Sequence, residues 1–176
     1  MKKFIAAISL CLSITATSFA QDQVLKFAPI GFYQYSADGF GSGYSFQFGY
    51  ERVVSQNITA QINVGAEFRN RIFNFVFGSA RLNDYRLFLK PEMAYYLLNE
   101  SLDGLYLGGF YTIGFGGDVG GALMGLGPQV GYQFLLLQNQ LAVDLNLEIG
   151  PGFLISTDDS NIGFHSYISV SVGYAF

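Results

Sequence analysis

Apolar and polar side chains alternate with a period of two along most of this chain. Residues 43–51 read GYSFQFGYE, in which every second residue is aromatic. Residues 58–69, ITAQINVGAEFR, repeat the pattern with mainly aliphatic side chains. This period is typical of β-strands that have one apolar and one polar face. Each run is about as long as the roughly 9–11 residues that a tilted membrane-spanning strand needs.

The alternating runs predict eight strands separated by polar or glycine-rich connections. An even number of strands, with short and longer connections in turn, is typical of single-chain transmembrane barrels. We therefore expect an all-β fold, an eight-stranded antiparallel up-and-down transmembrane β-barrel. The expected strands span residues 24–35, 43–53, 58–69, 85–97, 104–116, 122–135, 141–153 and 163–176.

Composition supports the same fold. Charged residues make up 12% of the chain and apolar residues 51%, whereas a soluble domain has about 25% charged residues. No apolar run in residues 21–176 approaches the roughly 18 residues of a spanning helix. A closed barrel is the other structure that pairs all of its backbone groups inside a bilayer.

The first 20 residues have the pattern of a secretory signal peptide. Two lysines precede an apolar run over residues 4–14, and Ala20 ends a small-residue cleavage site. The expected domains are a signal peptide over residues 1–20 and an outer-membrane barrel over residues 21–176. The leader holds two of the nine basic residues and none of the 13 acidic ones, so the net charge of residues 21–176 is −6. This charge argues against nucleic acid as a partner.

Large apolar side chains fill one phase of the expected strands, and small or polar side chains fill the other. Lipid accommodates the former and a narrow interior the latter, so we expect the apolar phase to face outward. Aromatic residues near the strand ends should form two girdles at the membrane interfaces. The expected periplasmic girdle comprises Tyr50, Tyr95, Tyr132, Phe134, Tyr174 and Phe176. The expected outer girdle comprises Tyr33, Tyr44, Phe115, Phe153 and Phe164.

Four prolines interrupt the expected strands. Proline lacks a backbone N–H, and a closed barrel has no edge at which a missing donor is harmless. We expect bulges or kinks at Pro29, Pro91, Pro128 and Pro151, all of which fall in the outward phase.

The segment RIFNFVF, residues 71–77, reverses the alternation because Phe73 directly follows Ile72. One interpretation is a strand that continues above the membrane with a bulge. The other is an apolar mouth over residues 72–77 that meets a lipid or a protein. The sequence leaves both interpretations open.

The chain resembles the small eight-stranded outer-membrane barrels of Gram-negative bacteria, the group typified by the OmpA transmembrane domain and OmpX. The leader, the alternating strands and the terminal VGYAF carry the resemblance, and LKPEMAYYL, GLGPQVGYQF and LAVDLNLEIGPGF look like an uncharacterised subgroup. The resemblance implies a place in the cell outer membrane, among lipid and lipopolysaccharide. It also implies that the barrel assembly machinery reads Tyr174 and Phe176 as an assembly signal. We expect a monomer without cofactors.

Charged residues in the inward phase are the first candidate site. The interior of an eight-stranded barrel is just wide enough for side chains to fill, so buried charges must pair. Two interpretations stay open, an ion-paired plug and a gated narrow pore. The expected lumen charge network comprises Glu51, Glu67, Arg69, Arg86, Lys90, Glu92, Asp144 and Glu148.

His165 is the only histidine and lies beside Ser166 near the outer end of the last strand. Some outer-membrane barrels are lipid-modifying enzymes that use a His and a Ser at the outer leaflet. Asp158 or Asp159 is available to orient the imidazole. However, adjacent strand residues point to opposite faces, which argues against a catalytic pair. The acidic segment around these aspartates lacks the glycine and distal glutamate of a calcium loop, so we expect no metal site.

The sequence therefore predicts a non-enzymatic outer-membrane barrel with a packed polar lumen. Its expected role is structural or surface-interacting within the cell envelope. A narrow channel, or a carrier for small or apolar molecules, is the alternative. An outer-leaflet lipid-modifying enzyme is the third interpretation.

Overall fold

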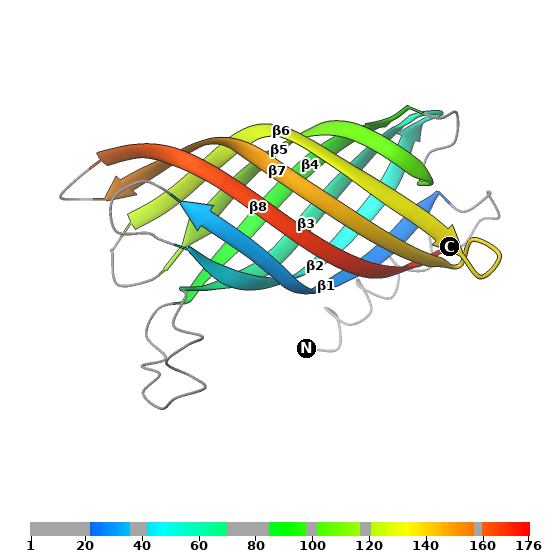
Figure 1. Ribbon diagram of the computed structural model, residues 1–176, viewed down its shortest axis with the longest axis horizontal. Coiled ribbons are helices and arrows are strands. Elements are labelled where there is room, and N and C mark those ends of the chain that lie inside the picture. Colours follow the sequence, from blue (N-terminus) through cyan, green and yellow to red (C-terminus); the bar gives the residue numbers. More distant parts are fainter. Residues whose placement is uncertain (1–21, 36–41, 70–84, 98–101, 117–120, 157–159) are drawn as a thin grey trace, which may run out of the picture.

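The strands of the computed structural model close into one antiparallel barrel, with each strand beside its neighbours in sequence (Figure 1). The structure describes residues 22–35, 42–69, 85–97, 102–116, 121–156 and 160–176. The strands are β1 (Gln23–Tyr35), β2 (Ser42–Ser55), β3 (Ile58–Arg69), β4 (Tyr85–Tyr96), β5 (Gly104–Phe115), β6 (Gly121–Leu136), β7 (Leu141–Ser156) and β8 (Ser160–Ala175). The predicted eight-stranded up-and-down barrel is confirmed. Within these ranges no helix is long and apolar enough to cross a membrane.

The last strand closes the barrel against the first. β8 pairs with β1 in antiparallel register, from Val24 opposite Ala175 to Tyr35 opposite His165. The backbone N–H of Phe176 donates to the Gln23 carbonyl at 2.9 Å, and the Gln23 N–H donates back to the Phe176 carbonyl at 3.2 Å. The C-terminus is thus tied into the ladder, and closure removes the open edges at which sheets aggregate.

The β7–β8 hairpin extends further than the sequence pattern predicts. β7 continues to Ser156 and β8 begins at Ser160, with Ile155 opposite Ser160 at the end of the ladder. The expected strands stopped at residue 153 and started at residue 163. Backbone pairing does not depend on apolar alternation, so a hairpin can continue after the lipid-facing pattern ends.

The two faces of the barrel divide as the alternation predicts. Along β4 exposed and buried residues alternate without a break, and Leu87 and Met93 are both 58% exposed. On β8 the residues from Ile168 to Tyr174 that occupy the apolar phase are exposed, and those between them are buried. The large apolar side chains therefore form the outer wall. The lumen receives the small and polar phase.

Pro29 produces a bulge that changes the phase of β1. The register of β1 shifts by one residue against β2 between Ala28 and Gly31, and against β8 between Phe27 and Ile30. Tyr33 is consequently buried in the lumen at 5% exposure, so its assignment to the outer girdle was wrong. The extra residue of a bulge moves every later side chain to the other face. The other ten expected girdle residues are exposed or partly exposed.

The remaining three prolines leave the register unchanged, so of the two expected features, a bulge or a kink, the bulge is absent at these positions. β4 and β5 lack ladder pairs beside Pro91, and the same registers resume on both sides. β6 and β7 lack pairs beside Pro128 and Pro151, between Gly125 opposite Gly152 and Gln129 opposite Glu148. A proline removes one donor but adds no residue, so pairing lapses locally without a slip.

Close backbone contact replaces hydrogen bonding in this gap between β6 and β7. A β-carbon built on Gly150 would collide with the backbone oxygen of Leu126, and one on Gly127 with the backbone oxygen of Ile149. Backbone atoms of a closed ladder cannot move aside cheaply. By contrast, the nearest atom to a β-carbon on Gly109 is the Gly127 oxygen at 3.6 Å, an ordinary contact.

We predict that Gly150→Ala destabilises the barrel by about 1–3 kcal/mol because the new methyl group forces the strands apart. The matched control Gly109→Ala, on the neighbouring strand pair, should cost clearly less. Urea titration in phospholipid vesicles, read from the mobility of unheated samples on gels, measures both. Equal midpoints for the two variants would contradict the close approach.

Candidate functional site

The barrel interior holds most of the charged residues that strand phase assigned to it. Arg69 is the exception, because its side chain lies outside what the structure describes. The other seven are all less than 7% exposed, namely Glu51, Glu67, Arg86, Lys90, Glu92, Asp144 and Glu148. They gather into two clusters and one pair.

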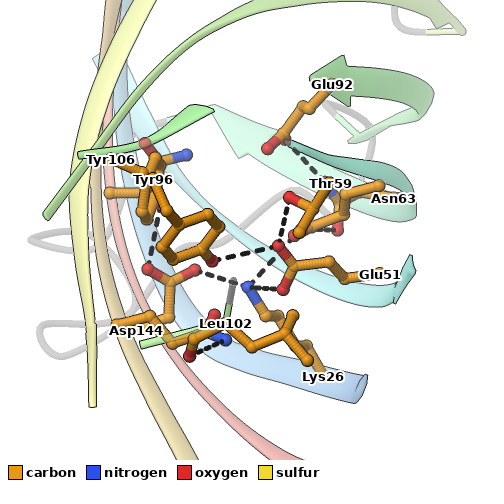
Figure 2. Close-up of polar contacts among 12 residues, drawn as sticks. Lys26, Glu51, Thr59, Asn63, Glu92, Tyr96, Leu102, Tyr106 and Asp144 are labelled. Atoms are coloured by element: carbon orange, nitrogen blue, oxygen red, sulfur yellow. Dashed lines mark hydrogen bonds and ion pairs between the residues drawn. The ribbon is translucent and has the colours of Figure 1, made fainter. Parts of the chain in front are cut away.

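The first group, the Lys26 cluster, is built around a lysine of β1 (Figure 2). The Lys26 Nζ lies 2.8 Å from Glu51 Oε2 on β2 and 2.9 Å from Asp144 Oδ2 on β7. It also donates to Gln61 Oε1 on β3 at 3.1 Å. One ammonium group thus bridges two carboxylates from strands that are not neighbours in the barrel.

Hydroxyl groups complete the Lys26 cluster. Thr59 Oγ1 donates to Glu51 Oε1 at 2.7 Å, and the Tyr96 hydroxyl donates to the same oxygen at 3.1 Å. The Tyr106 hydroxyl donates to Asp144 Oδ1 at 2.9 Å. Each carboxylate therefore receives bonds from the lysine and from at least one hydroxyl. Such donors spread the charge of a buried carboxylate.

The second group, the Lys90 cluster, repeats this arrangement with amide donors. The Lys90 Nζ lies 3.0 Å from Glu92 Oε1 and also pairs with Glu148 Oε1. Asn63 Nδ2 donates to Glu92 at 2.6 Å, and Asn146 Nδ2 donates to Glu148 at 2.8 Å. Again one lysine bridges two carboxylates from different strands.

Two of the buried cations also lie over aromatic rings. The Lys90 Nζ lies 4.3 Å from the ring centroid of Tyr167, whose hydroxyl is 2.9 Å from Ser45 Oγ. Arg86 pairs with Glu67, and its guanidinium carbon lies 5.9 Å from the Tyr33 ring centroid. Cation–π contacts of this kind stabilise a buried cation without a further carboxylate.

Acidic groups outnumber basic ones in the described lumen. Three cationic side chains face five carboxylates, and all eight are buried. The set is Lys26, Arg86 and Lys90 with Glu51, Glu67, Glu92, Asp144 and Glu148. Removing charges from water is costly unless each is paired and hydrogen-bonded, so these contacts are a requirement of the fold.

Sequence reasoning missed Lys26 and the two tyrosines of its cluster. Lys26 lies between Leu25 and Phe27, both exposed, so strand phase alone assigns it to the lumen. Tyr96 follows the exposed Tyr95 and must point inward for the same reason. The signal was present in the sequence, because Lys26, Tyr96 and Tyr106 all fall in the inward phase of their strands.

His165 is buried in the lumen, apart from the serine beside it. Its exposure is 2%, and its Nε2 atom lies 3.8 Å from Glu148 Oε2. Its ring centroid is 5.1 Å from that of Phe110. Ser166 lies on the other face of β8 and is partly exposed, which confirms that the adjacent pair is split. No His–Ser dyad forms at this position.

Two other expectations fall on residues outside the described ranges. These are the acidic pair Asp158 and Asp159 and the apolar segment 72–77. Within the described ranges, no group of three or more His, Cys, Asp or Glu side chains is placed to hold a metal ion.

Comparison with known proteins adds fold-level information. No protein-family model and no curated protein sequence matches the chain. Among solved structures, neisserial surface protein A is similar at 14% identity with a TM-score of 0.63, covering 88% of this chain and 96% of that one. The attachment invasion locus protein Ail of Yersinia pestis is similar at 11% identity with a TM-score of 0.51, covering 89% and 100%.

The chain has the fold of the small eight-stranded outer-membrane barrels. The predicted resemblance is therefore confirmed at the level of the fold. The closed ladder and the outward apolar belt, together with this fold, place the protein in the outer membrane.

We predict that Lys26→Met destabilises the barrel by about 3–5 kcal/mol, because it leaves two buried carboxylates without their cation. Exposed Arg52→Met, on the next strand, is the control and should change stability little. The triple variant Lys26→Met/Glu51→Gln/Asp144→Asn should recover most of the loss. Urea midpoints in vesicles measure all three. A single variant as stable as wild type would show that the cluster is energetically unimportant.

Proposed function

We propose that the protein is a non-enzymatic outer-membrane barrel with a sealed lumen and a surface-contact role in the cell envelope. The observation that supports the proposal is the packing of ion-paired and apolar clusters along the described part of the lumen. In the described residues, apolar clusters lie towards both ends of the barrel, with the ion-paired clusters between them.

The apolar clusters support a sealed interior. Towards the periplasmic end, Val24, Leu102, Ala142 and Ala175 pack together. Towards the outer end, Tyr33, Leu123, Leu154 and Tyr167 pack together. A hydrated ion path needs polar surface along its length, and dry apolar constrictions oppose it.

A sealed barrel acts through its outer surface, its lipid contacts, or both. The printed names of the similar structures describe a surface protein and an attachment protein, and Ail has also been solved with the heparin analogue sucrose octasulfate at 12% identity and a TM-score of 0.51. In this chain the longest connection, residues 70–84, carries Arg71, Arg81 and one acidic residue, Asp84, so its net charge is +1 in a protein that is otherwise acidic. We place the contact with an outside polyanion on this segment.

The remaining parts of the proposal concern assembly and surroundings. The protein works as a monomer among lipid and lipopolysaccharide, without a cofactor. Tyr174 and Phe176, both exposed in the outward phase, serve as the signal for the barrel assembly machinery. An enzymatic role is not proposed, because His165 and Ser166 lie on opposite faces of β8.

We predict that cells displaying the protein adhere to heparin-coated surfaces and that Arg71→Gln/Arg81→Gln lowers this adhesion several-fold. Salt should weaken the adhesion because screening acts on exposed charges. Arg52→Gln is the control and should leave adhesion unchanged. Equal adhesion of cells with and without the protein would refute the polyanion contact.

We predict no discrete conductance steps for the wild-type protein in planar bilayers, because the lumen is filled. The variant Tyr96→Ala/Tyr106→Ala removes two large rings from the lumen and should produce steps. Wild-type steps whose size changes in Lys90→Ala or Glu92→Ala would instead support the narrow channel, since those residues would then line its path.

A further inference from the structure

The Lys26 cluster joins side chains from six of the eight strands. Its members come from β1, β2, β3, β4, β5 and β7, and they link to one another through Lys26, Glu51 and Asp144. Figure 2 shows the lysine between the two carboxylates. Among the described contacts, only β6 and β8 contribute no side chain to the Lys26 cluster.

Those two strands flank Asp144 on either side. Gln133 of β6 and Ser171 of β8 are the direct cross-strand partners of Asp144. Side chains of directly opposed residues on one face have their β-carbons about 4.5–5.5 Å apart. Gln133, at 0% exposure, and Ser171, at 5%, face the lumen on the same side of the wall as Asp144.

Both neighbours present a buried oxygen without a hydrogen-bond partner among the described residues. These atoms are Gln133 Oε1 and Ser171 Oγ. The amide orientation of Gln133 is fixed, because its Nε2 donates to the Leu102 carbonyl at 2.8 Å and its oxygen must then point elsewhere. Unsatisfied buried acceptors are costly, so a donor or a cation belongs beside them.

The charge of the cluster indicates which of the two belongs there. Lys26 is the only cation that pairs with Glu51 and Asp144 among the described ion pairs, which leaves the cluster with one excess negative charge. A water molecule would satisfy the two oxygens but would leave that charge uncompensated. A monovalent cation satisfies both requirements at once.

We propose that a small monovalent cation such as Na⁺ binds in the lumen between the Asp144 carboxylate, Gln133 Oε1 and Ser171 Oγ. Carboxylate, amide and hydroxyl oxygens are the ligands that hard cations take. A single excess charge matches a monovalent ion better than a divalent one. The bound cation extends the Lys26 cluster to β6 and β8, so that side chains of all eight strands are linked through it.

The test compares the stability of the full barrel in NaCl with its stability in N-methylglucamine chloride at the same concentration and pH. Both salts screen charge equally, but the organic cation is too large for the site. At a Na⁺ concentration ten times the dissociation constant, the folding equilibrium constant should rise about elevenfold. The readout is the urea midpoint of folding in vesicles of zwitterionic phospholipid.

Two variants assign the effect to this site. Asp144→Asn removes the charge and should abolish the Na⁺ dependence. Ser171→Ala removes a hydroxyl that has no protein partner, and it should shift the Na⁺ titration to concentrations about tenfold higher. Ser169→Ala is the matched control, since Ser169 is equally buried on the same face of β8 but lies opposite Asn146. It should keep the full response.

Three results would overturn the proposal. The first is the same midpoint in both salts. The second is an unchanged Na⁺ titration in Ser171→Ala. The third is a urea midpoint that does not depend on the cation but rises as the pH falls. That result would mean that a proton, and not a metal ion, neutralises the cluster. None of these results bears on the surface-contact role, which is tested by adhesion.

Discussion

Backbone hydrogen bonding in a solvent without water is the constraint on which this structure depends. Inside a bilayer, an unpaired N–H or C=O group has no alternative partner, so strands must close into a ring. The closure of β8 on β1 meets that demand and sends one phase of every strand to lipid. The other phase faces a space just wide enough for side chains. Charged residues in that space are cut off from bulk water and must be neutralised across the barrel.

Neutralisation explains the repeated design of the lumen. Lys26 and Lys90 each bridge two carboxylates that lie on different strands, and in the first case Lys26 and Asp144 are 118 residues apart in sequence. Hydroxyl groups serve the first cluster and amide groups the second. Because each bridge ties distant strands together, the clusters also favour one register over a slipped one. Ion-paired clusters that tie distant strands together oppose a continuous water path, and the proposed function at the outer surface rests on this argument.

Only one of the four prolines coincides with a change of strand register. Pro29 coincides with an extra residue in β1, which carries Tyr33 into the lumen beside Arg86. Pro128 and Pro151 fall in one gap of the β6–β7 ladder, where Gly127 and Gly150 bring the backbones together. A proline removes one backbone N–H donor, whereas a bulge adds one residue to a strand. The presence of a proline in the sequence does not show which of the two changes occurs.

The sequence by itself determined the fold, the number of strands and the face on which Glu51, Lys90 or Glu148 lies. A period of two assigns each side chain to lipid or lumen, and this information is local to each strand. Only the tertiary structure decided that Lys26 pairs with Asp144 and that Tyr33 faces inward. It also placed Ser171 opposite Asp144, with a hydroxyl that has no partner among the described residues. Those outcomes depend on the stagger between neighbouring strands and on a single bulge. The stagger is not encoded in alternation, because a period of two reads the same after any shift by two residues. The bulge is a shift by one residue, and the sequence shows it only as the change of apolar phase between Phe27 and Ile30.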